Sequence, residues 1–352
     1  MNDLTVSGVS IRGLSVAVPS TREDNSQLGS LSVKARKEII EQVGIRFRCI
    51  APEGVTAADL CQAPAEKLLS ELGWNPEEIG LLIFVSQTPD HTVPGTATQL
   101  QQKLKIDRHA ISLDINQGCA GYVYGLSVAC GMMKTYGIDR ALLLVGDTIT
   151  RIISKEDNSL RPIFSDAGSA TALELDPGNE DEMIFRIGSK GDAYEAIHVR
   201  DGGARYPISP GSLRMETISE GVSRQRDQLN MNGQAVFTFG LSTVAEEIIA
   251  LLKDHGRDES DIDHIVLHQA NQLLNNAIAR KVGFPKEKAP SSLYDFGNTS
   301  CATIPVTLLS RLRDELRNSR LSLLLSGFGV GLSWGNVLLT TDHVVCPELI
   351  EL

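Results

Sequence analysis

Residues 111–126 read ISLDINQGCAGYVYGL, and they contain the pattern that decides the fold. Apolar and polar residues alternate over 111–115, which indicates a half-buried strand, and residues 121–126 read as the start of a helix. Cys119 lies in the turn between the two. Residues 141–146, ALLLVG, then form an aliphatic run that ends in glycine and is typical of a buried strand. A strand, a cysteine-bearing turn, a helix and a second strand together predict an α/β fold with mostly parallel sheets.

A second stretch repeats this arrangement in the carboxyl-terminal part of the chain. Residues 296–301, FGNTSC, precede a helix-length run, and residues 321–331, LSLLLSGFGVG, form the aliphatic strand that follows. A repeat separated by about half the chain indicates duplication of one αβ unit, because solenoid repeats are only ~20–50 residues long. The acidic, turn-rich segment 176–182 lies between the copies and marks the boundary. We therefore predict two similar halves, residues 1–178 and residues 179–352.

The other elements are predicted from periodicity. Alternation over residues 1–20 predicts a pair of strands, and residues 200–228 form a long polar loop. A helix over 57–72 begins after Thr56 with a capping pattern, and Pro64 is expected to bend or shorten it. Buried strands are predicted at 81–85, 141–145, 265–267 and 321–325, and further helices at 95–105, 120–135, 238–254, 272–282 and 303–316.

Composition and charge limit the classes of function. The chain has 352 residues and a net charge of −11, so its surface repels phosphate backbones and anionic lipids, and we expect neither nucleic acid nor membrane as a partner. No apolar run approaches ~18 residues and the first residues lack a secretory signal, which favours a cytoplasmic location. The six cysteines are scattered without a metal-type pair, so we expect free thiols rather than disulfides or a metal site.

Cys119 is the candidate nucleophile. A cysteine between a strand and a helix faces free backbone N–H groups and the positive end of the helix dipole, which predicts a lowered pKa for its thiol. Gly118 and Gly121 beside it allow a substrate to approach the backbone closely. The alternative interpretation is that this small residue is simply packed in the core.

Two further residues lie where α/β proteins place their sites. His268 follows residues 263–267 at the carboxyl end of a predicted strand, and Asn298 lies in the Gly-Asn-Thr segment of the second copy. Each also has an ordinary interpretation, the histidine as a core residue bonded to the backbone and the asparagine as a turn or helix cap. Residues 326–335, SGFGVGLSWG, end a buried strand with alternate glycines, and free N–H groups in such a turn can stabilise an oxyanion.

Taken together, these segments resemble the β-ketoacyl-acyl-carrier-protein synthase III family. The resemblance rests on motifs in that family's order, namely NQGCAG at 116–121, HQAN at 268–271, GNTS at 297–300 and GFGVG at 327–331. The spacing also agrees, with 149 residues from Cys119 to His268 and 30 from His268 to Asn298. The resemblance implies the thiolase fold, in which two similar halves form a five-layer αβαβα sandwich, and it implies a homodimer.

The family's mechanism assigns roles to these residues by resemblance. Cys119 would take an acyl group from acyl-CoA, and a malonyl thioester on acyl carrier protein would then lose carbon dioxide and give a 3-oxoacyl thioester. His268 and Asn298 would donate hydrogen bonds to the thioester oxygen as enolate charge develops. The backbone N–H groups of Cys119 and Val330 would form the oxyanion hole for acylation. The resemblance implies no metal and no organic cofactor, and it places the chain among the acyltransferases of fatty acid biosynthesis.

The substrate-binding residues implied by the resemblance are Arg46, Val93, Arg161, Asn271 and Phe328. Val93 stands where the family often has a phenylalanine that closes the acyl pocket from the partner subunit. The smaller side chain favours an acyl group longer or bulkier than acetyl, although a change of this size decides only ~1–3 kcal/mol of selectivity.

The binding surfaces differ from the family's pattern in other places. Residues 31–42 contain no tryptophan, whereas the family usually stacks one there on the adenine of CoA. Thr238 and Leu273 replace two basic residues often credited with docking the carrier protein. These differences favour a specialised relative over the enzyme that starts ordinary fatty acid synthesis.

Three other functions are considered. In the first, the same acyl-enzyme passes its acyl group to an alcohol or amine instead of a malonyl thioester. In the second, the chain is a non-catalytic subunit, which is disfavoured because Cys119, His268 and Asn298 are all present. The third, a condensation of the hydroxymethylglutaryl type, lacks a convincing glutamate for its general acid.

Overall fold

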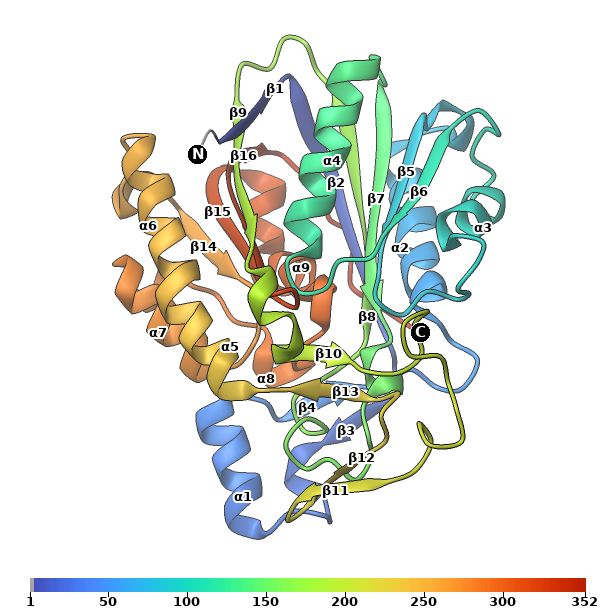
Figure 1. Ribbon diagram of the computed structural model, residues 1–352. Coiled ribbons are helices and arrows are strands. Elements are labelled where there is room, and N and C mark those ends of the chain that lie inside the picture. Colours follow the sequence, from blue (N-terminus) through green and yellow to red (C-terminus); the bar gives the residue numbers. More distant parts are fainter. Residues whose placement is uncertain (1–2) are drawn as a thin grey trace.

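The computed structural model describes residues 3–352 and consists of five alternating layers of helices and sheets (Figure 1). The first sheet has six strands in the order β17 (Ile350–Glu351), β2 (Val9–Val18), β8 (Ala167–Leu175), β7 (Arg140–Asp147), β5 (Leu81–Val85) and β6 (Ile111–Ile115). The second has five strands in the order β1 (Leu4–Ser7), β9 (Glu182–Ser189), β16 (Ser333–Asp342), β15 (Arg320–Gly329) and β14 (His264–Leu267). The aliphatic runs identified in the sequence are therefore strands.

Helices cover both outer faces and fill the space between the sheets. The middle layer consists of α4 (Gly121–Tyr136) and α9 (Thr303–Asn318), and each contacts strands of both sheets. The outer face of the six-stranded sheet carries α2 (Ala57–Leu72) and α3 (Thr96–Lys103). The other outer layer contains α5 (Gly233–Phe239), α6 (Ala245–Asp254) and α7 (Gln272–Val282), with a π-helical turn between α5 and α6. The predicted αβαβα sandwich is confirmed.

Short elements lie at one end of the sandwich, below the sheets in Figure 1. They are the helices α1 (Val33–Glu38) and α8 (Leu293–Phe296) and three antiparallel strand pairs. The pairs join β3 (Arg22–Asp24) to β4 (Phe47–Cys49), β10 (Ile197–Val199) to β13 (Leu229–Met231), and β11 (Glu216–Ser219) to β12 (Val222–Arg224). The predicted loop over 200–228 therefore contains a small hairpin.

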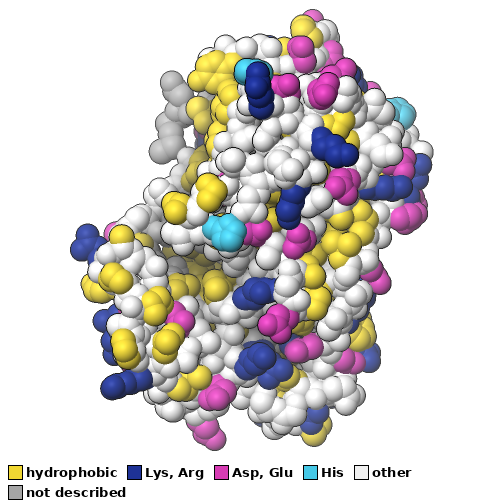
Figure 2. All heavy atoms as spheres, turned by 90° about the vertical axis from the view of Figure 1, so that its right-hand side faces the viewer, with side chains coloured by type: hydrophobic (Ala, Val, Ile, Leu, Met, Phe, Trp, Pro, Cys, Tyr) yellow, Lys and Arg dark blue, Asp and Glu magenta, His cyan; other side chains and the backbone are white. Residues whose placement is uncertain are grey.

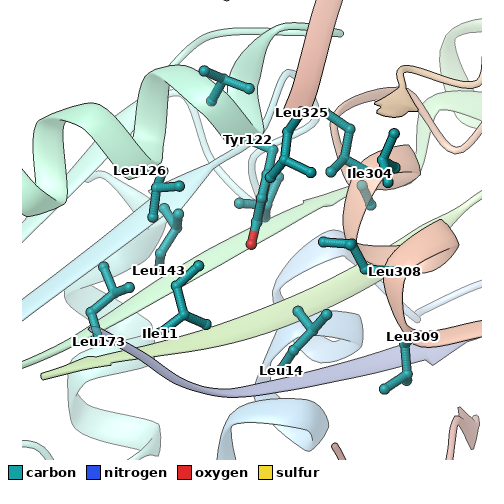
Figure 3. Close-up of a cluster of buried hydrophobic side chains, with 14 of the residues drawn as sticks. Ile11, Leu14, Tyr122, Leu126, Leu143, Leu173, Ile304, Leu308, Leu309 and Leu325 are labelled. Carbon is teal, nitrogen blue, oxygen red and sulfur yellow. The ribbon is translucent and has the colours of Figure 1, made fainter. Parts of the chain in front are cut away.

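The core between the sheets explains why the middle helices are so apolar. Tyr122 and Leu126 of α4 face Leu143 of β7, while Leu308 of α9 lies over Leu14 of β2 (Figure 3). These side chains are almost completely removed from water. Burying a leucine-sized side chain contributes about 1.5–3 kcal/mol, so this cluster holds the two sheets on a shared pair of helices.

Three details differ from the sequence-based expectations. The sheets are mixed rather than mostly parallel, because β8 pairs antiparallel with both β2 and β7 and β16 pairs antiparallel with β15 and β9. The strands predicted within residues 1–20 form, but they belong to different sheets, since β1 pairs with β9 and β2 with β8. Pro64 lies inside a continuous α2 and does not shorten it.

The division into halves at residue 178 stays a prediction, and the terminal strands cross it. Residue 178 lies in the turn between β8 and β9, while β1 joins the sheet of the second half and β17 joins the sheet of the first. Each sheet is therefore completed by a strand from the opposite end of the chain.

One helical run bears on the predicted absence of a membrane. Residues Gly233–Asp254 are long and apolar enough to cross a bilayer by length and composition alone, although the buried helices of a folded core pass the same test. In this fold the run packs on α7 and on β16, and Ile248 and Leu251 are buried. The absence of a membrane partner and the cytoplasmic location stay predictions.

The charged residues are dispersed over the face that α2 and α3 form. Basic and acidic side chains lie among hydrophobic ones across this face of the molecule (Figure 2). The net charge of −11 is thus not gathered into one acidic area on this side.

Candidate active site

Cys119 lies in the turn between β6 and α4, at the base of a pocket between the two halves. Cys119 is 7% exposed, and its sulfur packs against the glycine-rich end of β15. A Cβ atom at Gly329 would lie 2.5 Å from the sulfur of Cys119, and Gly329 has a φ of +153°. Only glycine fits there, because any side chain would occupy the space of the nucleophile.

Burial, with a smaller contribution from Asp147, raises the pKa of the Cys119 thiol to about 11. The backbone N–H groups of Val330 and of Cys119 itself act on the sulfur in the opposite direction and lower the pKa. The predicted lowering of this pKa is therefore wrong, because loss of solvation outweighs the two N–H groups. Both N–H groups nevertheless act on the sulfur as hydrogen-bond donors.

His268 follows β14 and is held by its backbone and by its ring. The backbone N–H of His268 donates to the backbone carbonyl of Ser326 at 2.7 Å, which continues the pairing of β14 with β15. Nδ1 lies 2.7 Å from Oγ1 of Thr303, and the ring packs edge-on against Phe328 with centroids 5.5 Å apart. Burial lowers the pKa of His268 to about 3, so the imidazole is neutral at physiological pH.

Asn298 is fixed so that its amide nitrogen is left for the pocket. The backbone N–H of Asn298 donates to the backbone carbonyl of Ile163 at 3.0 Å, and its backbone carbonyl accepts from the N–H of Ser165 at 2.9 Å. Its side-chain Oδ1 accepts from the N–H of Ser300 at 2.9 Å. Because the side-chain oxygen is occupied in this way, Nδ2 is the group that can donate to a ligand. Ser300 has a φ of +53°, a left-handed conformation that supports this tight turn.

The structure brings the three predicted catalytic residues into one pocket. Cys119, His268 and Asn298 all line one cavity. Most of its wall is apolar, with residues from both halves that include Ile149, Phe164, Leu229, Val236, Phe237 and Leu274. A thiol, a neutral imidazole and a carboxamide in an apolar pocket can form a thioester and stabilise an enolate.

Comparison with known proteins agrees with this chemistry. The family described as 3-oxoacyl-[acyl-carrier-protein (ACP)] synthase III matches residues 113–191, and its C-terminal family matches residues 252–341. A β-ketoacyl-[acyl-carrier-protein] synthase III of Rhizorhabdus wittichii is 31% identical over 324 residues, which cover 92% of this chain and 96% of the relative. One of Synechococcus is 30% identical and covers 95% and 98%. The chain belongs to the β-ketoacyl-ACP synthase III family.

Solved structures confirm the thiolase-like fold. A 3-oxoacyl-(acyl-carrier protein) synthase from Burkholderia xenovorans superposes with a TM-score of 0.93 at 34% identity, covering 100% of this chain and 99% of that one. A priming β-ketosynthase of the R1128 polyketide pathway, at 23% identity and a TM-score of 0.80, shares the fold. The prediction that the chain is a condensing enzyme of this family is confirmed at that level.

The predicted substrate-binding residues divide into two groups. Asn271 and Phe328 line the pocket of this synthase, and Oδ1 of Asn271 also caps α7 by accepting from the N–H of Leu274 at 2.8 Å. Val93 does not line it and is 81% exposed. Arg46 also lies outside, where it donates to Tyr294 and contacts Asp24.

Arg161 lines a second, more charged cavity that adjoins the first. Phe164 is shared by the two, and the second cavity is surrounded by Glu23, Arg48, Glu53, Arg151, Lys155 and Arg161. The guanidinium of Arg48 is buried and fully engaged with Glu23, Asn25 and the carbonyl of Phe164. Sequence reasoning missed this cavity because its residues come from separate segments of the chain.

Gln87 is a pocket residue that the motifs did not reveal. It follows β5, and its N–H donates to Oδ1 of Asp147 at 2.7 Å. Its carboxamide lies against Gly118, where a Cβ atom would come within 2.3 Å of Oε1. The available signal was its position at the carboxyl end of a buried strand, the same signal that identified His268.

Among residues 3–352 the structure shows no group of three or more His, Cys, Asp or Glu side chains that could hold a metal ion. The six cysteines are all buried and free.

Proposed function

We propose that this synthase acylates Cys119 from acyl-CoA and then condenses the acyl group with malonyl-ACP. The observation that carries the proposal is the convergence of Cys119, His268 and Asn298 in one apolar pocket. Membership of the β-ketoacyl-ACP synthase III family supports the same two-step chemistry.

In the first step the sulfur of Cys119 attacks the thioester carbonyl. The S–C bond to CoA breaks, the acyl group is transferred to Cys119, and CoA leaves as a thiol with the proton of the cysteine. The oxyanion is held by the N–H groups of Cys119 and Val330, which already act on the sulfur. Loss of one such donor typically raises a barrier by ~2.7–4 kcal/mol.

In the second step the malonyl thioester loses carbon dioxide and becomes an enolate. Its oxygen accepts hydrogen bonds from His268 and from Nδ2 of Asn298, while its carbon attacks the acyl carbonyl. The bond to Cys119 breaks, the sulfur takes up a proton from the solvent, and a 3-oxoacyl thioester leaves. The apolar wall of the pocket supports this step, because removing water weakens the solvation of the carboxylate that departs and strengthens the two hydrogen bonds.

The acyl group is proposed to be longer or bulkier than acetyl, in a specialised lipid or polyketide pathway. The apolar wall of the pocket supports this. The homodimer is part of the proposal, since Val93 is exposed and β6 is the edge strand of its sheet, so both are free to meet a second copy. Light scattering on the purified protein tests this, and a monomer would remove the role assigned to Val93.

The test of the main proposal follows each half-reaction separately. The protein is incubated with a panel of acyl-CoA thioesters, and the adduct is located by intact-protein and peptide mass spectrometry. The acyl-enzyme then receives malonyl-ACP, and carbon dioxide and the 3-oxoacyl product are measured. An adduct on any residue other than Cys119 would contradict the proposal. If only acyl groups of two or three carbons are transferred to Cys119, the proposal of a longer or bulkier acyl group is contradicted.

A second acceptor is favoured by two residues that are adjacent in sequence to the pocket-lining Phe237 and Leu274. Leu273, which is 52% exposed, and Thr238 stand where the family often has basic residues, so an acidic carrier protein gains no charge attraction from them. An alcohol or amine acceptor would then give an ester or an amide. An acyl-enzyme that is stable towards malonyl-ACP but is discharged by an alcohol or an amine would establish this alternative.

A further inference from the structure

Thr303, the first residue of α9, places a hydroxyl against the catalytic histidine. Its Oγ1 lies 2.7 Å from Nδ1 of His268 and 3.1 Å from the carbonyl oxygen of Ser300. Thr303 is fully buried, and both His268 and Ser300 are 2% exposed, so bulk water does not compete for these contacts. The family motifs end before this residue, and the steps described above do not use it.

The groups beside Nδ1 differ in what they can do. A carbonyl only accepts hydrogen bonds, so Ser300 can stabilise only a ring that carries its proton on Nδ1. A hydroxyl can also donate, and donation to Nδ1 stabilises the ring that carries its proton on Nε2. Burial lowers the pKa of His268, so the ring is neutral and has a single N–H to place. The position of that proton decides whether Nε2 is a donor or an acceptor.

We propose that Thr303 is a positioning residue that donates its hydroxyl proton to Nδ1 of His268 and so keeps the ring proton on Nε2. The hydroxyl has one proton and two acceptors within reach, and its contact with the ring, at 2.7 Å, is shorter than that with the carbonyl, at 3.1 Å. Nδ1 is occupied by this contact, so Nε2 is the nitrogen left for a ligand. The inference rests on the proposed function, in which the enolate oxygen needs a donor at Nε2.

Loss of the hydroxyl therefore has a specific consequence. The carbonyl of Ser300 contacts Oγ1 of Thr303 and acts on the imidazole as a hydrogen-bond acceptor, so once the hydroxyl is gone it favours a ring that carries its proton on Nδ1. Nε2 then becomes an acceptor and cannot donate to the enolate. Acylation of Cys119 does not depend on this donor, because its oxyanion is held by backbone N–H groups. Decarboxylation should fall while acylation is preserved.

Three variants test this. Thr303→Val removes the hydroxyl and keeps the shape, whereas Thr303→Ser keeps the hydroxyl. Thr307→Val is the matched control, because Thr307 is equally buried one turn further along α9 and its hydroxyl contacts Ser292 and the carbonyl of Thr303 instead of His268. Acylation is followed as the rate of adduct formation, and decarboxylation as carbon dioxide released in a single turnover of the preloaded acyl-enzyme.

In Thr303→Val we expect decarboxylation to fall about 10²-fold, as for the loss of one oxyanion donor, with acylation within about threefold of the wild type. Thr303→Ser should restore decarboxylation to within about threefold, and Thr307→Val should leave both steps unchanged. An equal loss of both steps in Thr303→Val, or no loss in either, would overturn the inference, as would failure of the serine variant to restore the rate.

A direct reading of the tautomer does not require activity. Nitrogen NMR of histidine-labelled wild-type protein, with the His268 signals assigned by comparison with His268→Gln, distinguishes a protonated Nε2 from a protonated Nδ1. We expect the proton on Nε2 in the wild type and on Nδ1 in Thr303→Val. A wild-type ring protonated on Nδ1 would refute the inference. A wild type that has the expected tautomer but forms no acyl adduct would instead refute the proposed function.

Discussion

Helices α4 and α9 occupy matching places in the two halves of the molecule. Each has 16 residues, lies between the sheets, and begins after an alanine that provides no side-chain cap. Their amino-terminal ends meet at the pocket, where Cys119 precedes α4 and Asn298 precedes α9. The same structural unit therefore places a thiol in the pocket in one half and a carboxamide in the other.

The two ends differ in how they act. At α4 the side chain proposed as the nucleophile is Cys119, and the backbone N–H groups of Cys119 and Val330 act on its sulfur. At the start of α9 the corresponding contacts come from side chains. Oδ1 of Asn298 is occupied, so its Nδ2 is left to donate, and Oγ1 of Thr303 contacts Nδ1 of His268. The comparison suggests that the α4 end is responsible for acylation and the α9 end for decarboxylation, and each prediction below tests that division.

The largest expected effect is loss of the acyl adduct on removal of Cys119, with Cys301 near the start of α9 as the matched control. Cys119→Ala should abolish the acyl adduct, because no other group at the pocket base replaces the sulfur. Cys301→Ala, in the corresponding part of the second half, should leave the adduct intact, since its sulfur lies 3.2 Å from Oδ2 of Asp147 and the pKa of its thiol is raised well above normal by burial. Mass spectrometry after incubation with acyl-CoA measures both. An acyl adduct that still forms in Cys119→Ala would show that Cys119 is not the acylated residue and that acylation does not belong to the α4 end.

Asn298→Ala should act on the second step alone. Its Nδ2 is the free donor of the pair with His268, and removal of one such donor lowers the rate about 10²–10³-fold. Acylation should change by less than about threefold, since the first oxyanion is held by backbone groups. Single-turnover carbon dioxide release and the burst of CoA measure the two steps. If the burst falls as much as the carbon dioxide release, the two ends are not functionally separate.

The pH dependence of Cys119 alkylation tests the α4 end more finely. Burial raises the pKa of the thiol to about 11, so the thiolate is the minor form at neutral pH and increases with pH. Its alkylation by iodoacetamide in the free enzyme should therefore rise about tenfold per pH unit between about pH 7 and 9. Peptide mass spectrometry of timed samples gives the rate at Cys119. A rate that is already constant above about pH 7 would mean that the N–H groups outweigh burial.

The sequence predicted the polar residues of this site better than their properties. Cys119, His268 and Asn298 were identifiable because each lies at a strand or helix end within a motif. The direction of the Cys119 pKa shift was not, because it depends on solvation lost to walls contributed by distant segments such as Leu229 and Phe328. Gln87 stood in no motif.

The arrangement of the sheets was also only partly predictable. Hydrophobic runs located the buried strands, because a strand covered on both faces is apolar throughout. The direction of pairing depends on how the turns connect them, as at residues 329–333, where β15 turns back into β16. The separation of β1 from β2 depends on partners near residues 170 and 184, which alternation over residues 1–20 does not specify.

The smallest expected effect concerns the body of α4 rather than its end. Gly131 lies in the interior of this helix, and a Cβ atom there would meet nothing within 4 Å. Gly131→Ala should raise the free energy of unfolding by about 0.5–1 kcal/mol, because alanine loses less conformational entropy in a helix. Acylation and decarboxylation should both stay at wild-type rates, since the substitution is three turns from Cys119. Denaturant unfolding and the two half-reaction assays measure this. A gain in stability accompanied by slower acylation would show that the amino-terminal end of α4 must move for Cys119 to react, so that the nucleophile depends on the flexibility of the helix as well as on its position.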